Sequence, residues 1–121
     1  MENNLEKFSI TENCPVRGVL DHLGDKWSIL VMMVLGEVEK MRFNELNKTI
    51  PDISQKMLTV TLRSLEADGL IKRTIFPQVP PKVEYEITER GKSLLFHINN
   101  LTNWAIKNMA DIKESRKLFN A

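Results

Sequence analysis

The chain is poor in the features that mark secreted, membrane-embedded and metal-dependent proteins. Its 121 residues include one cysteine, Cys14, which excludes an intrachain disulfide framework and a cysteine-cluster zinc site within this sequence. The longest apolar stretch, residues 27–35 with Ser28 inside it, is far shorter than the roughly 20 residues that span a bilayer. Residues 1–10 are polar and lack the apolar segment of a secretory signal. We therefore expect a cytoplasmic protein that makes no membrane contact.

An excess of positive charge is missing as well, because the formal net charge is only +1, so the whole chain shows no preference for nucleic acid. Charge is nevertheless unevenly distributed. Residues 1–40 carry more acidic than basic groups. Residues 54–82 carry the reverse, with Lys56, Arg63, Lys72, Arg73 and Lys82 against Glu66 and Asp68. A local excess of this size is common on solvated surfaces, so it gains weight only from the motif on which it lies.

Composition and length indicate one globular domain. Hydrophobic residues make up 42% of the chain and charged residues 27%, which is too apolar a mixture for a disordered protein. A chain of this length buries one core and leaves no room for a separate catalytic domain. We expect a single domain over residues 1–121.

Capping residues and apolar spacing predict two helices before residue 40. Pro15 suits the first turn of a helix over residues 16–23, and Gly24 is expected in the left-handed conformation that ends it. Asp25 can cap the next helix, about residues 26–37. The apolar residues of this helix recur at three- and four-residue steps and predict a buried stripe, made of Trp27, Leu30, Val31, Val34 and Leu35.

Residues 43–68 predict a helix-turn-helix. A short helix over residues 43–49 is broken by Pro51, and a second helix runs from the cap residue Ser54 to about residue 68, where Gly69 stops it. One face of the second helix is apolar and the other is polar and cationic, so it can contact phosphates or base edges. A solvated amphipathic helix is the plain alternative. The candidate DNA-binding residues are Arg42, Ser54, Gln55, Lys56, Thr59 and Arg63, joined by Lys82 from the hairpin that follows.

That hairpin is the element that turns a helix-turn-helix into a winged helix. Residues 70–76 and 83–88 are rich in β-branched and aromatic side chains. The segment between them holds three prolines and Lys82, so we expect a stiff, slightly basic loop that can lie beside a phosphate backbone. A plain surface hairpin is the alternative that the loop alone leaves open.

Thr88 can cap a long last helix, which we expect to continue to about Ile112 or beyond. Its apolar residues follow a near-heptad spacing and exceed what one small domain can cover. Together with the apolar side of the first helix they predict a dimer interface, against the competing explanation of an intrachain core. The candidate interface residues are Val16, Val19, Leu20, Leu94, Ile98, Leu101 and Ala105.

The expected fold is therefore α+β and mainly α: a winged helix-turn-helix with an N-terminal helix and a long C-terminal dimerisation helix. Its expected parts are an N-terminal arm over residues 1–13, the helix-turn-helix over 43–68, the wing hairpin over 70–88 and the dimerisation helix over 89–112. We expect no enzyme activity, cofactor or metal, because His22 and His97 lack a cysteine partner or a His-x-x-His spacing.

Six short motifs carry a family resemblance: residues 14–16, 24–27, 42–46, 53–58, 62–71 and 79–85, with Thr88 and Gly91 after them. In this order they resemble the HxlR-type family, winged helix-turn-helix regulators of bacteria that are related to the MarR group. The resemblance covers about residues 14–104. It implies a homodimeric transcription factor, repressor or activator, that binds an inverted-repeat operator in double-stranded DNA. It also implies that the helix from Ser54 is the recognition helix and that the hairpin over Pro80 and Pro81 is the wing.

The resemblance further implies a role for Cys14, because several family members sense oxidants or electrophiles with the matching cysteine. The other cysteine of the two-cysteine members is missing here. Cys14 precedes Pro15, where unpaired N–H groups and the helix dipole stabilise a thiolate, and Lys26 or Arg17 could assist. A packing role without reactivity is the alternative. An oxidant or small-molecule effector is thus a candidate partner.

A winged helix that binds protein or RNA is the remaining alternative, because a fold alone does not dictate function. Aromatic platforms for single-stranded nucleic acid are missing from the polar face of the second helix and from the expected loop of the wing. Their absence counts against RNA as the partner.

Overall fold

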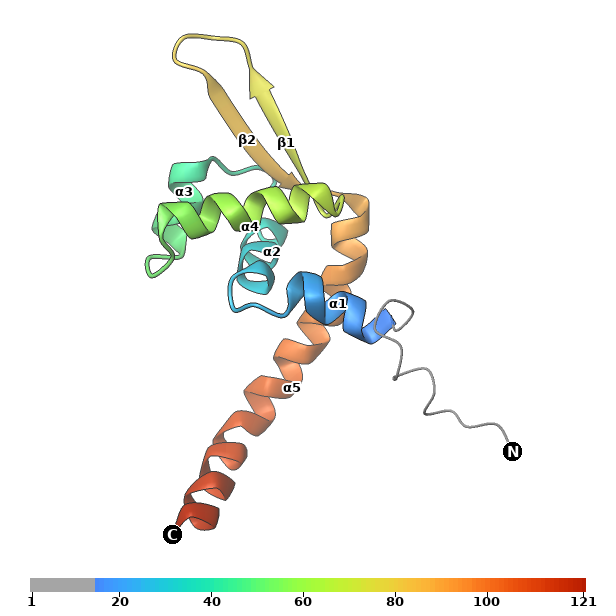
Figure 1. The fold of residues 1–121 in the computed structure, drawn as a ribbon, viewed down its shortest axis with the longest axis vertical. Helices are drawn as coiled ribbons and strands as arrows, with labels where there is room; N and C mark the ends of the chain where they lie inside the picture. The colour runs from blue at the N-terminus through green and yellow to red at the C-terminus, as the bar shows by residue number, and fades with distance from the viewer. Residues whose placement is uncertain (1–14) are drawn as a thin grey trace, which may run out of the picture.

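Five helices and one two-stranded hairpin form the part of the chain that the computed structural model describes, residues 15–121 (Figure 1). In chain order these are α1 (Pro15–Leu23), α2 (Ser28–Gly36), α3 (Phe43–Thr49), α4 (Gln55–Ala67), β1 (Ile71–Phe76), β2 (Lys82–Ile87) and α5 (Glu89–Asn120). The order confirms the expected mainly α, α+β winged helix-turn-helix. Within residues 15–121, none of the helices combines the length and the apolar character needed to cross a bilayer.

Asp25 caps α2, as its sequence position predicts. Its Oδ1 accepts hydrogen bonds from the backbone N–H groups of Trp27 and Ser28, each at 2.8 Å, and its Oδ2 accepts one from the Ser28 hydroxyl at 2.7 Å. Burial by itself would raise the pKa of this carboxyl, but the hydrogen bonds from Ser28 and Trp27 outweigh it and lower the pKa. The helix begins at Ser28 and not at Lys26, because the intervening residues form the capping turn.

Gly24 does not adopt the left-handed conformation expected at the end of α1. Among residues 15–121, Gly69 is the glycine with a positive φ, at 73°. Gly24 instead donates its N–H to the Leu20 carbonyl at 2.7 Å, and a Cβ at this position would collide with that same carbonyl oxygen. Glycine is therefore suited to this turn by close backbone approach and not by its φ.

The core is built around α2, which packs against α3, α4, α5 and β2. Its members with the least exposure are Val31, Met32, Leu35, Leu46, Leu58, Leu62 and Leu65. A Leu side chain taken fully out of water contributes roughly 1.5–3 kcal/mol of transfer free energy. The predicted stripe on α2 is only partly correct, because Leu30 is 42% exposed while Met32, outside the stripe, is fully buried. Since α2 is apolar on every side, spacing could not identify its outward face.

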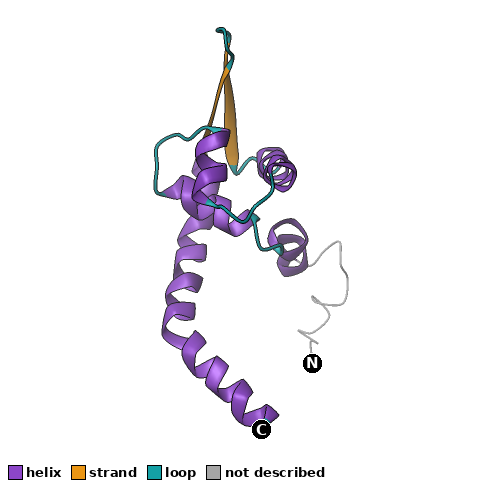
Figure 2. Cartoon of the chain, turned by 90° about the vertical axis from the view of Figure 1, so that its left-hand side faces the viewer, coloured by secondary structure: helices purple, strands orange, loops and turns teal. Residues whose placement is uncertain are grey.

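The wing is an antiparallel pair that runs from Ile71 opposite Ile87 to Phe76 opposite Lys82. It projects from the helical body (Figures 1 and 2). The loop before α3 is tied to it, because Met41 and Tyr85 exchange two backbone hydrogen bonds of 2.9 and 2.8 Å. This bridge joins the start of the helix-turn-helix to the wing.

The last helix, α5, is longer than residues 89–112, since it ends at Asn120. Thr88 caps it: the Thr88 hydroxyl accepts a hydrogen bond from the Gly91 N–H at 3.1 Å. The first half of α5 packs on the body, and its C-terminal half extends away from the other described elements (Figures 1 and 2). Ile98, a predicted interface residue, is instead 5% exposed and belongs to the core of the chain, because this part of α5 lies against α2.

Candidate nucleic-acid interface

One face of α4 is buried and the other is exposed and polar. Leu58, Thr61, Leu62 and Leu65 are its buried residues. The exposed candidate residues are Ser54, Gln55, Lys56, Thr59 and Arg63, and we refer to them as the recognition face. These five predicted residues thus lie together, Ser54 as the N-cap of α4 and the other four on its outer side. A helix of this kind can enter the major groove of B-form DNA, which is about 12 Å wide.

Two hydroxyl groups of the recognition face already make hydrogen bonds within the chain. Ser54 caps α4, and its Oγ accepts a hydrogen bond from the Met57 N–H at 3.0 Å. The Thr59 hydroxyl donates to the Gln55 carbonyl at 2.9 Å. Because a hydroxyl has one proton, Ser54 retains a donor that suits a phosphate oxygen, whereas Thr59 retains only acceptor capacity. An acceptor suits the amino groups of adenine and cytosine in the major groove.

Two apolar residues that are not among the candidate DNA-binding residues also lie exposed on α4. Met57 is 40% exposed and Val60 is 54% exposed. An apolar side chain between polar ones on a solvent-facing helix is the signal that could have identified them. Such side chains can contact the methyl group of thymine in the major groove.

Lys82 is held against the wing and does not extend freely. Its Nζ lies 4.9 Å from the centre of the Phe76 ring and 3.9 Å from Glu84 Oε1. The aromatic ring and the carboxylate fix the ammonium group, and the carboxylate offsets part of its charge. At the wing tip, Val79 is fully exposed. The loop therefore presents less positive charge and more apolar surface than its sequence suggested.

Arg42 lies outside α4. It precedes α3, its side chain is exposed, and its backbone N–H donates to Glu45 Oε1 at 3.0 Å. The neighbouring Met41 is bonded to Tyr85 of the wing. Arg42 is thereby positioned between the helix-turn-helix and the base of the wing.

An ion pair joins α4 to the wing. Arg73 of β1 lies opposite Tyr85 of β2, and its Nε is 3.5 Å from Glu66 Oε1 of α4. Tyr85 is half-buried, and this burial raises the pKa of its hydroxyl despite the opposing charges of Arg73 and Arg63. The Arg73–Glu66 ion pair thus connects α4 to the sheet.

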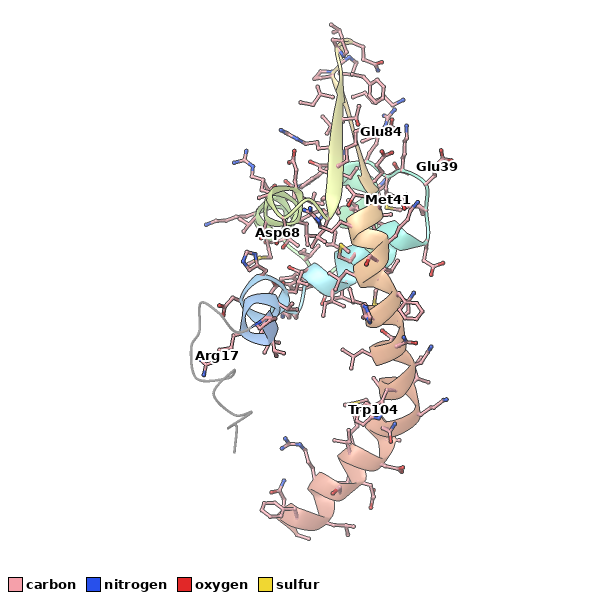
Figure 3. The ribbon with its side chains drawn as sticks, turned by 90° about the vertical axis from the view of Figure 1, so that its right-hand side faces the viewer. Arg17, Glu39, Met41, Asp68, Glu84 and Trp104 are labelled. Carbon is pink, nitrogen blue, oxygen red and sulfur yellow. The ribbon has the colours of Figure 1, made fainter. Side chains whose placement is uncertain are left out.

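The predicted interface residues other than Ile98 lie on exposed or partly exposed surface. Leu20 and Leu101 are 60% and 59% exposed, Val16 and Val19 are similarly exposed, and Leu94 and Ala105 are partly buried. An apolar groove of about 400 Å³ lies between α1 and α5, lined by residues that include Val19, Leu20, Leu23 and Leu101. Trp104, further along α5, is also exposed (Figure 3).

The remaining candidates divide between described and undescribed parts of the chain. Cys14 lies outside the described residues. His22 Nδ1 is 2.9 Å from Asp68 Oδ1, and His97 lies edge-on to Phe96 with ring centres 5.4 Å apart. In residues 15–121, no group of three or more His, Cys, Asp or Glu side chains is arranged to hold a metal ion.

Comparison with known proteins places this geometry in context. The model of the HxlR-like helix-turn-helix family matches residues 22–113. The HTH-type transcriptional regulator YdeP of Bacillus subtilis is 47% identical over 96 residues, which cover 79% of this chain and 74% of that protein. The structure of the transcriptional regulator YtfH from Salmonella typhimurium has a TM-score of 0.77 at 34% identity, covering 96% of this chain and 99% of that one. The redox regulator HypR in its reduced form has a TM-score of 0.76 at 42% identity, covering 84% and 98%.

Proposed function

This chain belongs to the HxlR-like helix-turn-helix family of transcriptional regulators, and we propose that it acts in the cytoplasm as a homodimer on an inverted-repeat DNA operator. The observation that carries this proposal is the outer side of α4. It exposes Lys56, Arg63 and Gln55 while the opposite side is buried in the core. A helix held in this way can offer cations to phosphates and an amide to base edges.

The proposed dimer is supported by the apolar groove between α1 and α5 together with the exposed half of α5. A two-fold axis through this region relates two copies of α4, and operator symmetry then mirrors protein symmetry. Half-sites one helical turn apart lie about 34–36 Å from each other. Each wing contacts the backbone that flanks its half-site, with Lys82 and Arg42 near the wing as candidate phosphate contacts.

Selection of bound fragments from the genomic DNA of the source organism tests this function. The purified chain should enrich duplexes that share an inverted repeat, with an affinity that falls steeply as salt concentration rises. The same protein should bind single-stranded RNA of matched length more weakly. Equal binding of the RNA, or no enriched duplex, would favour the alternative of a winged helix that recognises RNA or protein.

We further propose that Cys14 makes this regulator responsive to oxidants or electrophiles. The similarity of the chain to the redox regulator HypR supports this proposal. The place of Cys14 in the sequence, directly before Pro15, the first residue of α1, supports it as well. Helix N-termini favour the thiolate, which is the reactive form. With one cysteine per chain, the products open to it are a sulfenic acid, a mixed disulfide with a small thiol, an electrophile adduct, or a Cys14 to Cys14 bond across the dimer.

Treatment of wild type and Cys14→Ser with diamide tests the sensor. We expect diamide to release wild type from its operator and to leave Cys14→Ser bound, measured by fluorescence anisotropy with and without added reductant. An equal response of both proteins, or a response of neither, assigns Cys14 a packing role.

A further inference from the structure

Asp68, the C-cap residue of α4, accepts hydrogen bonds from residues of two other helices. His22 of α1 donates from Nδ1 to the Asp68 carboxylate, at 2.9 Å to Oδ1 and 3.1 Å to Oδ2. Arg90, in the first turn of α5, donates from Nη1 to the Asp68 carbonyl at 3.0 Å. Figure 3 shows Asp68 at the end of α4 nearest α1. The two helices that meet here are those that carry the proposed dimer surface.

Asp68 is held more tightly to α5 than to α1. On the α5 side, Gly69 has a φ of 73°, a Cβ on it would meet the Arg90 guanidinium, and its carbonyl accepts the Thr88 hydroxyl at 2.7 Å. On the α1 side, Leu23 is the residue of α1 that is buried. A groove of about 370 Å³ separates α1 from the rest of this junction, lined by residues that include Val19, His22, Asp68 and Leu70. The hydrogen bond from His22 therefore crosses a loosely packed contact.

We propose that Asp68 is a positioning residue that couples the placement of α1 and α5 in the dimer to the orientation of the recognition helix α4. The proposal rests on the proposed function as a dimeric DNA-binding regulator. α1 has little buried surface of its own to fix it, so a directional hydrogen bond determines where its end sits relative to α4. A displacement of α1 by a partner subunit, or by a modification at the residue before Pro15, then tilts α4 and changes the separation of two recognition helices.

Stability alone does not account for this arrangement. The His22 side chain is 60% exposed and that of Asp68 is 22% exposed, and an exposed pair of this kind adds little to folding stability. A hydrogen bond to a charged acceptor is, however, sensitive to direction and distance. The hydrogen bond is therefore better suited to fixing the orientation of α1 relative to α4 than to stabilising the fold.

The test measures operator spacing and not affinity alone. Duplexes that carry the selected inverted repeat are made with the half-sites moved by one or two base pairs, and the ratio of Kd values between altered and native spacing is taken for each protein. Asp68→Ala and His22→Ala should lower this ratio at least about twofold, as expected when members of one hydrogen-bond network are removed. Each should keep the affinity of wild type for an unrelated duplex and melt within a few degrees of it.

Three further variants make the test specific. Asp68→Asn should keep the wild-type ratio, because its amide oxygen still accepts the hydrogen bond from His22. Lys92→Ala should also keep it, since it breaks an exposed ion pair of 3.3 Å with Glu89 that lies wholly within α5. The double variant His22→Ala with Asp68→Ala should be no worse than the worse single variant, because both remove the same bond.

An unchanged spacing ratio in both His22→Ala and Asp68→Ala would overturn this inference while leaving the proposed function intact. A wild-type protein that prefers no spacing, or binds no inverted repeat, would overturn both. If Asp68→Ala fails to fold, His22→Ala on the exposed side chain decides the matter by the same ratio.

Discussion

Hydrogen bonds within the chain decide which donor and acceptor atoms of the recognition face remain free for a ligand. Ser54 uses an acceptor to cap α4 and Thr59 uses its proton on the Gln55 carbonyl, so the two hydroxyls present opposite chemistry to the groove. Lys56 and Arg63 are exposed and offer donors only. With Gln55, whose amide both donates and accepts, the face carries more donor groups than acceptor groups. This chemistry suits a groove bordered by phosphate oxygens.

Alanine at Lys56 or Arg63 should weaken operator binding without loss of stability, because neither side chain is buried. If the side chain reads a guanine, discrimination at one base pair should relax by about 1–3 kcal/mol, and if it contacts phosphate, all duplexes should weaken together with a smaller salt slope. Fluorescence anisotropy over a set of single-base operator variants separates the two. Lys92→Ala on α5 is the control cation, and wild-type affinity in both α4 variants would remove this face from the interface.

Asp25 should make folding stability depend on pH in the acid range. Its folded-state pKa lies below the ordinary value of 3.8 because the hydrogen bonds from Ser28 and Trp27 outweigh burial. A depressed pKa contributes stability that is fully present above the unfolded-state value and is lost as pH falls through the folded-state value. Asp25→Ala should cost about 0.5–2 kcal/mol at neutral pH through loss of the cap. Its melting temperature should also fall less steeply than that of wild type below pH 4 (about the unfolded-state pKa of Asp), and parallel curves would contradict the assignment.

At the scale of single elements, Thr88 joins the end of α4 to the start of α5. One hydroxyl accepts from the Gly91 N–H and donates to the Gly69 carbonyl, at 3.1 and 2.7 Å. Thr88→Ala removes both bonds and should lower the free energy of unfolding by about 1–2 kcal/mol. Thr88→Ser keeps the hydroxyl and should retain most of it. Urea unfolding of the three proteins measures the difference, and equal loss in both variants would point to the methyl group as the stabilising part.

Local chemistry explains why the elements could be predicted from the sequence. Asp25, Ser54 and Thr88 each cap the helix expected of them, and Gly69 stops α4 in the left-handed conformation. These residues form hydrogen bonds or turns with neighbours a few positions away, so the start or end of each helix can be predicted without knowledge of the tertiary structure. α3 even matches residues 43–49 at both ends.

Predictions that depended on partners across the fold were less accurate. Ile98 fits the heptad seam of α5 but packs into its own core, and Leu30 fits the stripe of α2 but is exposed. Spacing shows that a helix has an apolar face, while the neighbour that covers the face is determined by packing between distant segments. The pairing of His22 with Asp68, 46 positions apart, carried no sequence signal for the same reason.

At the scale of the whole molecule, a single subunit leaves much apolar surface uncovered. Val16, Val19 and Leu20 of α1 and Leu101 and Trp104 of α5 are each at least half exposed. Contiguous exposed apolar surface of this kind marks an interaction site on most soluble proteins. A second copy that covers it would bury the same residues on both sides of a two-fold axis.

Leu101→Glu should therefore yield a folded monomer that binds its operator weakly. Leu101 is 59% exposed, so a charge there leaves the subunit core intact, whereas Ile98→Glu would place a charge in that core and unfold the subunit itself. Sedimentation velocity should show wild type as a dimer whose melting temperature rises with protein concentration, and Leu101→Glu as a monomer whose melting temperature does not. Asn103→Glu, exposed and roughly opposite Leu101 on the helix, should remain dimeric. A wild-type monomer at micromolar concentration with full operator affinity would refute the dimer, because one recognition helix alone cannot read two half-sites.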